Sequence, residues 1–247
     1  IFVGDLANMW FLSRLGDEAV IAAIGYASSI LFFTISIGIG LSIAATSLVS
    51  PAIGAGYRVR ARRLSINVHL ATFVISLALG IGVWFAASWM LTQLGASGRA
   101  HELARDYLDI LLPSLPLLAV AMTSAAVLRS VGDARRAMNV TLIIAIVNVI
   151  LDPILIFGLD LGIRGAAIAS TFARLAALVV GLYGVIKVHD LMGRPRLRPF
   201  LGDVRAMLAI AAPAILTNIA TPAANAYVTA AIAPSGDAAV AAWAIIG

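Results

Sequence analysis

The chain contains no cysteine, and charged residues make up only 12% of its 247 positions. The lack of cysteine excludes disulfides, cysteine–zinc sites and thiol nucleophiles. The low charge content is unlike that of a soluble domain, in which about a quarter of the residues are charged. Hydrophobic residues make up 62% of the chain, and the mean hydropathy is +1.02. This composition is typical of a protein embedded in lipid.

Long apolar runs account for this composition. Several exceed the roughly 20 residues that a helix needs to cross a bilayer, and they are too many for a signal peptide. They are also far longer than the alternating strands of about 10 residues that build a membrane barrel. We therefore predict an all-α bundle of seven membrane helices and the start of an eighth. The predicted ranges are 1–14, 18–50, 64–94, 103–128, 136–157, 162–187 and 203–233, and the eighth helix opens at Gly236.

An internal repeat indicates how the bundle is divided. Residues 16–22 (GDEAVIA) recur as residues 236–242 (GDAAVAA), with five of the seven positions identical. Six predicted helices separate the copies, so both copies have the same orientation, as in transporters built from parallel repeats. We predict a six-helix first lobe at 1–188, a linker at 189–201 and the start of a second lobe at 202–247. Both chain ends fall within apolar runs, so we expect an incomplete two-lobe protein.

Basic residues predict the orientation in the membrane. Twelve lysines and arginines follow the second, fourth and sixth helices, whereas four lie in the alternate connections. The side with more positive charge is normally cytoplasmic, so these three connections are predicted to face the cytoplasm of an inner-membrane protein. The net charge of +5 comes from these short connections, which argues against nucleic acid as a partner. The expected surroundings are the lipid bilayer.

Ionisable residues within apolar runs are costly and indicate function. Asp5 and Asp152 lie well inside such runs, whereas Asp109 is expected near the membrane surface. Counted at about 1.5 Å per residue, Asp152 and Asn8 lie about 9 Å deep and Asp5 about 13 Å.

Asn148 is one turn deeper than Asp152, and Ser170 lies about 12 Å into the sixth helix. These oxygen-bearing side chains suit a small cation, and a carboxylate in a low-dielectric site can hold a proton near neutral pH. Pro153 adds a freed backbone carbonyl at Val149. The alternative is a polar clasp between helices that binds no ligand.

Several segments in order resemble the multidrug and toxic compound extrusion (MATE) family. They are residues 15–23, 48–56, 128–133, 148–153 and 161–170. The resemblance implies export of amphipathic, often cationic compounds, driven by sodium or proton influx through alternating access. It implies no enzyme activity and no cofactor beyond that coupling ion, and we expect a monomer.

The resemblance also implies a coupling site on the first, fifth and sixth helices. The expected site residues are Asp152, Asn148, Asp5, Asn8, Ser170 and Ala166. One position departs from the family pattern. The carboxylate of the first helix usually stands where this chain has Asn8, so either Asp5 takes its role or Asp152 acts alone.

Two other functions remain open from the sequence. A lipid-linked sugar flippase of the same architecture would need a charged cavity, and Arg174 is the single basic residue predicted at mid-span. Arg174 would face a cavity, pair with a carboxylate, or extend along the helix to the membrane surface. An intramembrane serine protease is suggested by residues 95–98 (GASG), which contain Ser97 with His101 nearby. That chemistry needs a buried serine and a histidine from a neighbouring helix, and Ser97 is predicted to lie in an outer turn.

Overall fold

The computed structural model describes residues 18–193 and 197–232, and within these ranges every regular element is helical. The α-helices are α2 (Glu18–Gly54), α3 (Arg58–Gln93), α4 (Gly98–Leu111), α5 (Leu115–Ser130), α6 (Ala134–Pro153), α7 (Gly162–Tyr183) and α8 (Leu197–Ile232). A 3₁₀ turn, η1 (Leu112–Ser114), joins α4 to α5, and the π-helical turns η2 (Ile154–Gly158) and η3 (Gly184–Val188) follow α6 and α7.

Six stretches of these helices are long and apolar enough to cross a membrane. They are Ala22–Gly54, Arg58–Gln93, Gly98–Ser130, Ala134–Gly158, Gly162–Val188 and Phe200–Ala220. The prediction of an all-α, membrane-spanning bundle is therefore confirmed for the second to the seventh predicted helices. The first predicted helix, the start of the eighth and the second copy of the repeat lie outside the described residues.

Glycine ends three of the helices with the same turn. After α2, Gly56 has a φ of +74°, and the N–H of Tyr57 donates to the carbonyl of Ala52 at 2.9 Å. Gly95 after α3 and Gly132 after α5 have φ values of +88° and +82° and are followed by equivalent bonds. This is the Schellman motif, in which a left-handed residue lets the chain satisfy the last carbonyls of the helix. Only glycine adopts that conformation without strain.

Some predicted helix limits are wrong. The second helix was predicted to end at residue 50, but α2 continues through Pro51 to Gly54. A proline removes only its own N–H, and the N–H of Ala55 still donates to the carbonyl of Pro51 at 3.0 Å. The third helix begins at Arg58 rather than at residue 64, and α8 begins at Leu197, inside the predicted linker. Polar residues were taken to mark connections, yet arginine is a good helix former and extends helices beyond the apolar run.

The fourth span was predicted as one helix from 103 to 128, but it is interrupted. Helix α4 ends at Leu111, and α5 begins at Leu115 after the 3₁₀ turn that contains Pro113. Pro116 follows in the first turn of α5. Residues 113 and 116 both lack the backbone N–H that a helix needs, which explains why the chain changes its hydrogen-bond pattern here.

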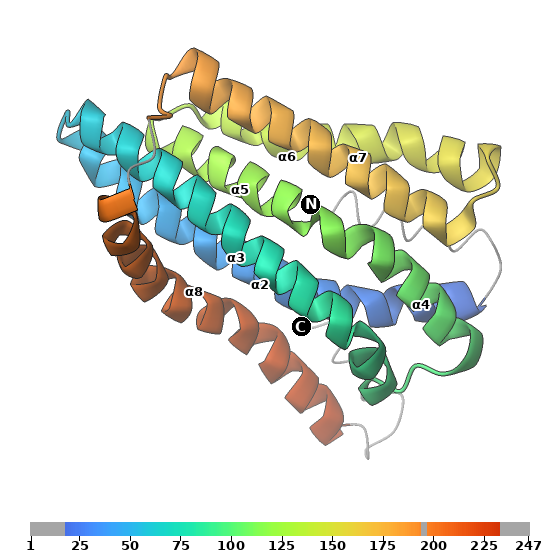
Figure 1. Ribbon diagram of the computed structural model, residues 1–247. Coiled ribbons are helices and arrows are strands. Elements are labelled where there is room, and N and C mark those ends of the chain that lie inside the picture. The colour runs from blue at the N-terminus through green and yellow to red at the C-terminus, as the bar shows by residue number, and fades with distance from the viewer. Residues whose placement is uncertain (1–17, 194–196, 233–247) are drawn as a thin grey trace.

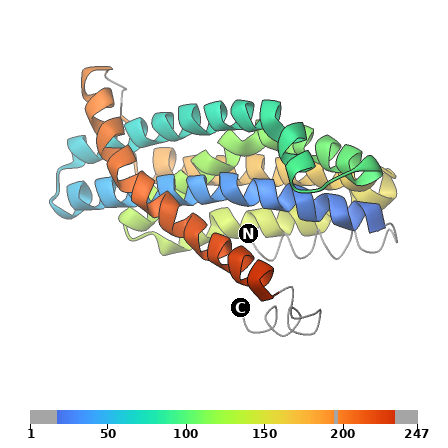
Figure 2. The ribbon, with the colours of Figure 1, turned by 90° about the horizontal axis from the view of Figure 1, so that it is seen from below.

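The helices form an elongated bundle (Figure 1). Helices α6 and α7 lie side by side, α5 lies between them and the α2–α3 pair, and α8 crosses the bundle on the side of α2 (Figures 1 and 2). Two buried apolar clusters fill the interior. One joins α2, α3, α5, α6, α7 and α8, and the other joins α2, α3, α4, the start of α5, η2 and α7.

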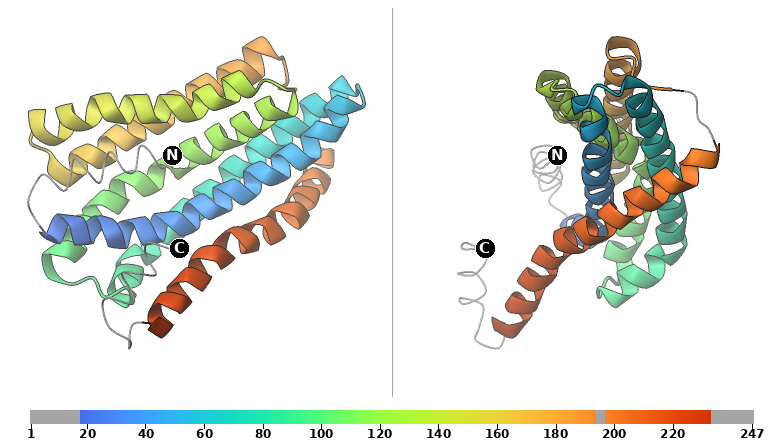
Figure 3. Two further views of the ribbon diagram at one scale, coloured as in Figure 1. Left: turned by 180° about the vertical axis from the view of Figure 1, so that it is seen from behind. Right: turned by 90° about the vertical axis from the view of Figure 1, so that its left-hand side faces the viewer.

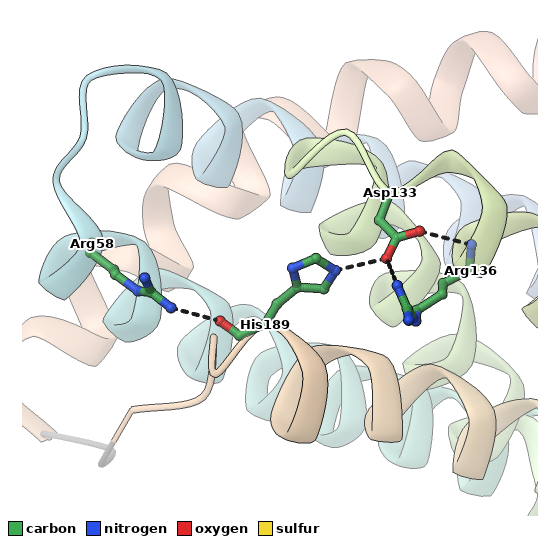
Figure 4. A network of polar contacts seen from close by, with 4 residues as sticks. All are labelled: Arg58, Asp133, Arg136 and His189. Atoms are coloured by element: carbon green, nitrogen blue, oxygen red, sulfur yellow. Dashed lines mark hydrogen bonds and ion pairs between the residues drawn. The ribbon is translucent and has the colours of Figure 1, made fainter.

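One end of the bundle carries most of the arginines. We call it the arginine-rich end; it comprises the turns α2–α3 and α5–α6 and residues 189–193 after η3. Figure 4 shows how these connections are joined. The Nε2 of His189 lies 2.8 Å from Oδ2 of Asp133, and an Nη1 of Arg136 lies 2.6 Å from the same oxygen. Arg58 donates to the carbonyl of His189 at 3.3 Å. The contact with His189, and next that with Arg136, holds the pKa of the Asp133 carboxyl well below its usual range.

Candidate functional site

Two polar side chains of α6 point into the bundle. Asn148 and Asp152 are four residues apart and therefore share one face of the helix. Their side chains are 4% and 0% exposed, whereas neighbouring Val149 is 48% exposed on another face. The carboxylate of Asp152 therefore lies inside the protein, away from the apolar surface of α6.

Helix α7 packs against α6 and supplies the next part of the site (Figure 1). Ala166, Ser170 and Arg174 are spaced by four residues along α7, and all three are buried. The structure thus places four of the predicted site residues on the buried faces of two adjoining helices: Asn148, Asp152, Ala166 and Ser170. The other two, Asp5 and Asn8, lie outside the described residues.

The connection between α6 and α7 explains their close approach. Helix α6 ends at Pro153, and the π-turn that follows is closed by a bond from the N–H of Leu159 to the carbonyl of Ile154 at 2.9 Å. The first turn of α7 lies directly on this π-turn. A Cβ on Gly165 would stand 2.6 Å from the carbonyl oxygen of Leu155, a distance that real Cβ atoms do not adopt. Only glycine at position 165 permits this contact with the backbone of Leu155, which lies three residues after Asp152 in the chain.

The chemistry of the site is that of oxygen donors. Oδ1 of Asn148 is buried and accepts no hydrogen bond from the described residues. Leaving such an acceptor unsatisfied costs about 1–3 kcal/mol, so a bound ion or water is expected to complete it. A carboxylate, an amide oxygen and a hydroxyl are ligands for a hard cation, or a place for a proton. In the described ranges no three His, Cys, Asp or Glu residues cluster as a metal site.

Arg174 has a role that the sequence did not predict. Its Nη1 donates to the carbonyl of Leu111 at 3.0 Å and to the hydroxyl of Ser114 at 2.7 Å. In a continuous helix the N–H of Leu115 would serve the carbonyl of Leu111, but it bonds to Leu112 instead. The guanidinium and the hydroxyl of Ser114, which donates to the same carbonyl at 2.8 Å, therefore satisfy the carbonyl freed by the break between α4 and α5. Arg174 is buried and does not extend to the membrane surface.

Replacing Arg174 by Met should destabilise the protein by about 1–3 kcal/mol, because two buried hydrogen bonds from a charged group would be lost and the carbonyl of Leu111 would keep only the hydroxyl of Ser114 as a donor, at 2.8 Å. The melting temperature of the purified full-length protein measures this effect. Arg164→Met is the matched control, since Arg164 forms an exposed ion pair with Asp106 at 2.8 Å, and such pairs contribute little. Equal losses in the two variants would contradict the assigned role of Arg174.

The residues that suggested a protease are not arranged as one. Ser97 is exposed in the turn before α4. The Nε2 of His101 lies 3.3 Å from the hydroxyl of Ser88, a residue of α3, and not beside Ser97. Neither the burial nor the serine–histidine pairing that intramembrane proteolysis needs is present at this turn.

The chain is similar in sequence to known membrane proteins. A family model described as MatE matches residues 1–154. The FAD transporter of Shewanella oneidensis is 34% identical over an alignment of 251 residues. The alignment covers 97% of this chain and 54% of that protein. A probable multidrug resistance protein NorM of Thermotoga maritima is 28% identical, over 78% of this chain and 42% of its own length. The chain spans about half the length of these relatives.

A solved structure shows the same fold. The MATE transporter VcmN of Vibrio cholerae in its bent form superposes with a TM-score of 0.92 at 28% identity, covering 99% of this chain and 56% of that chain. The superposition includes α8 as well as the helices α2 to α7 that precede it. Given a family model that matches more than half of the sequence and a relative that aligns with nearly all of it, the chain belongs to the MATE family of membrane transporters.

Proposed function

We propose that this chain forms the first lobe, and the start of the second, of an exporter driven by sodium or proton influx. The observation that carries the proposal is the fully buried carboxylate of Asp152 beside Asn148, whose amide oxygen accepts no hydrogen bond from the part of the chain that the structure describes. A buried charge in a membrane span is costly unless it is neutralised. Binding a proton or a sodium ion neutralises Asp152, and the bound and empty states then favour different conformations. Asp5 and Asn8 are proposed to complete the site from the first helix.

The proposed cargo is an amphipathic drug or metabolite. The relatives favour two kinds of compound, because one is a multidrug resistance protein and the other a FAD transporter. A cationic drug and the anionic dinucleotide FAD differ in charge, so they are separate candidates. The flippase alternative is not favoured, since the mid-span Arg174 already binds the break between α4 and α5.

We further propose that the arginine-rich end faces the cytoplasm, with the protein in the inner membrane as a monomer. Arg58, Arg60, Arg62 and Arg63 all lie in the first two turns of α3 at that end. The retention of positive charge on the cytoplasmic side supports this orientation.

Transport by the full-length protein in sealed vesicles tests the proposal. A sodium gradient and a pH gradient are imposed separately, and export of a cationic dye and of FAD is followed in each. We expect one gradient to drive accumulation of at least one compound against its own gradient. If neither gradient accelerates transport of either compound above the level of empty vesicles, the proposed function is wrong.

A further inference from the structure

Helix α8 is attached to the bundle at one end. Its contacts are with α2 and α3, and Figures 2 and 3 show that it crosses α2 near the arginine-rich end and leans away toward its own C-terminal end. Among the side chains described for α8, the fully buried ones are Met207 and Ala211, both in its first half. The attachment of α8 is therefore concentrated toward the arginine-rich end.

The contact between α2 and α8 is close. A Cβ on Gly40 of α2 would lie 3.1 Å from the backbone nitrogen of Ile215 and 3.2 Å from the carbonyl oxygen of Ala211. At this point the two backbones approach with no side chain from Gly40 between them. Small residues allow such approaches between membrane helices. The interface is thus tightly packed from Met207 to Ile215.

A polar cluster joins α8 to α3 nearer the end of the bundle. Oδ2 of Asp203, on α8, accepts a hydrogen bond from Nδ2 of Asn67 at 2.7 Å and lies 3.3 Å from Nε of Arg63. Arg63 and Asn67 are four residues apart on α3 and share one face. The side chain of Asp203 is 14% exposed, and that of Asn67 is 1% exposed. The carboxylate is therefore the group that joins α8 to α3.

Neighbouring contacts hold residues 189–193, rather than α8 itself, against α3. Arg62 forms an ion pair with Asp190 at 2.9 Å, and the N–H of Gly193 donates to the carbonyl of Arg62 at 3.3 Å. These contacts fasten residues 189–193 to α3 before α8 begins. They can persist while α8 moves, whereas the contacts of Asp203 cannot.

We propose that Asp203, Asn67 and Arg63 form a latch that holds α8 on α3 and keeps the arginine-rich side of the cleft between the two lobes closed. The inference rests on the proposed function, which assigns α8 to the second lobe. When α8 separates, water must reach the arginine-rich end of the apolar contact between α2 and α8. Because Arg63 and Asp203 lie near the end of the bundle, water can hydrate them once they part. A polar closure of this kind opens and re-forms more readily than a large apolar one.

Accessibility of a buried cysteine tests the latch without any transport measurement. Met207→Cys is introduced in a cysteine-free background of the full-length protein in nanodiscs, which is convenient because these 247 residues contain no cysteine. Labelling by a water-soluble maleimide reports how often the α2–α8 interface opens. We expect Asp203→Asn to accelerate labelling on the order of tenfold, the effect of losing one hydrogen bond to a charged group.

Asp190→Asn is the matched control, because it makes the same substitution at the same end but breaks only the contact of the connection with Arg62. Its labelling rate should equal that of the parent. Arg63→Gln should accelerate labelling, and adding it to Asp203→Asn should change little, since both remove one interaction. The latch is refuted if Asp203→Asn labels no faster than the parent, or if Asp190→Asn accelerates labelling equally. If the parent protein transports under neither gradient while the variants label as expected, that result would instead count against the proposed function.

Discussion

Replacing Asp152 by Asn should reduce gradient-driven export to the leak of empty vesicles. Asparagine has the size of aspartate and keeps its hydrogen-bonding capacity, but it cannot take up a proton and carries no charge for a sodium ion. The side chain is fully buried on the inner face of α6, so the substitution acts within the candidate site rather than at the lipid-facing surface. Export of dye or FAD under the imposed gradient, measured as an initial rate, gives the result.

The same substitution elsewhere provides the control. Asp109 of α4 pairs with Arg105 at 2.9 Å and is 40% exposed, so Asp109→Asn should leave export nearly unchanged. The melting temperature of the Asp152→Asn protein shows whether it is folded, so that a loss of export can be separated from a loss of structure. Normal gradient-driven export by a folded Asp152→Asn protein would eliminate this carboxylate as the coupling group.

The sequence was sufficient to predict the helical fold and the shared helix face of two candidate site residues. Helices were predictable because the lengths of the apolar runs are set by the thickness of the bilayer. Glycine follows α2, α3 and α5 in the structure because it can adopt the positive φ that the turn requires. Asn148 and Asp152 were predictable as neighbours because a spacing of four places them on one helical face, and both are buried.

Contacts between distant segments were not predictable in this way. Asp203 meets Asn67 across 136 residues, and Arg174 meets Leu111 across 63. No local pattern specifies such pairs, because they depend on how the helices pack. Part of the evidence for the role of Arg174 is in the sequence, because Pro113 and Pro116 lack the N–H groups that carbonyls of the preceding turn need in a helix. What the sequence did not reveal is that the donor comes from another helix.

Gly165→Ala is expected to damage both folding and transport. The added Cβ would meet the carbonyl oxygen of Leu155 at 2.6 Å, its carbon at 2.8 Å and the nitrogen of Ile156 at 3.1 Å. All three are backbone atoms of the π-turn, so the clash cannot be relieved by rotating a side chain. We expect a loss of about 1–3 kcal/mol of stability, the usual cost of overpacking. Displacing the start of α7 also moves Ala166 and Ser170 relative to Asp152, so export should fall with stability.

Gly82→Ala separates this steric effect from the general effect of adding a methyl group to a membrane helix. Gly82 lies within α3, and a Cβ there would have nothing within 4 Å. Alanine favours a helix over glycine by about 0.5–1 kcal/mol, so this variant should melt at or above the parent temperature and export normally. The melting temperature and the initial export rate of both variants decide the matter. If Gly165→Ala matches Gly82→Ala in both measurements, the close contact between α7 and the π-turn does not position the site.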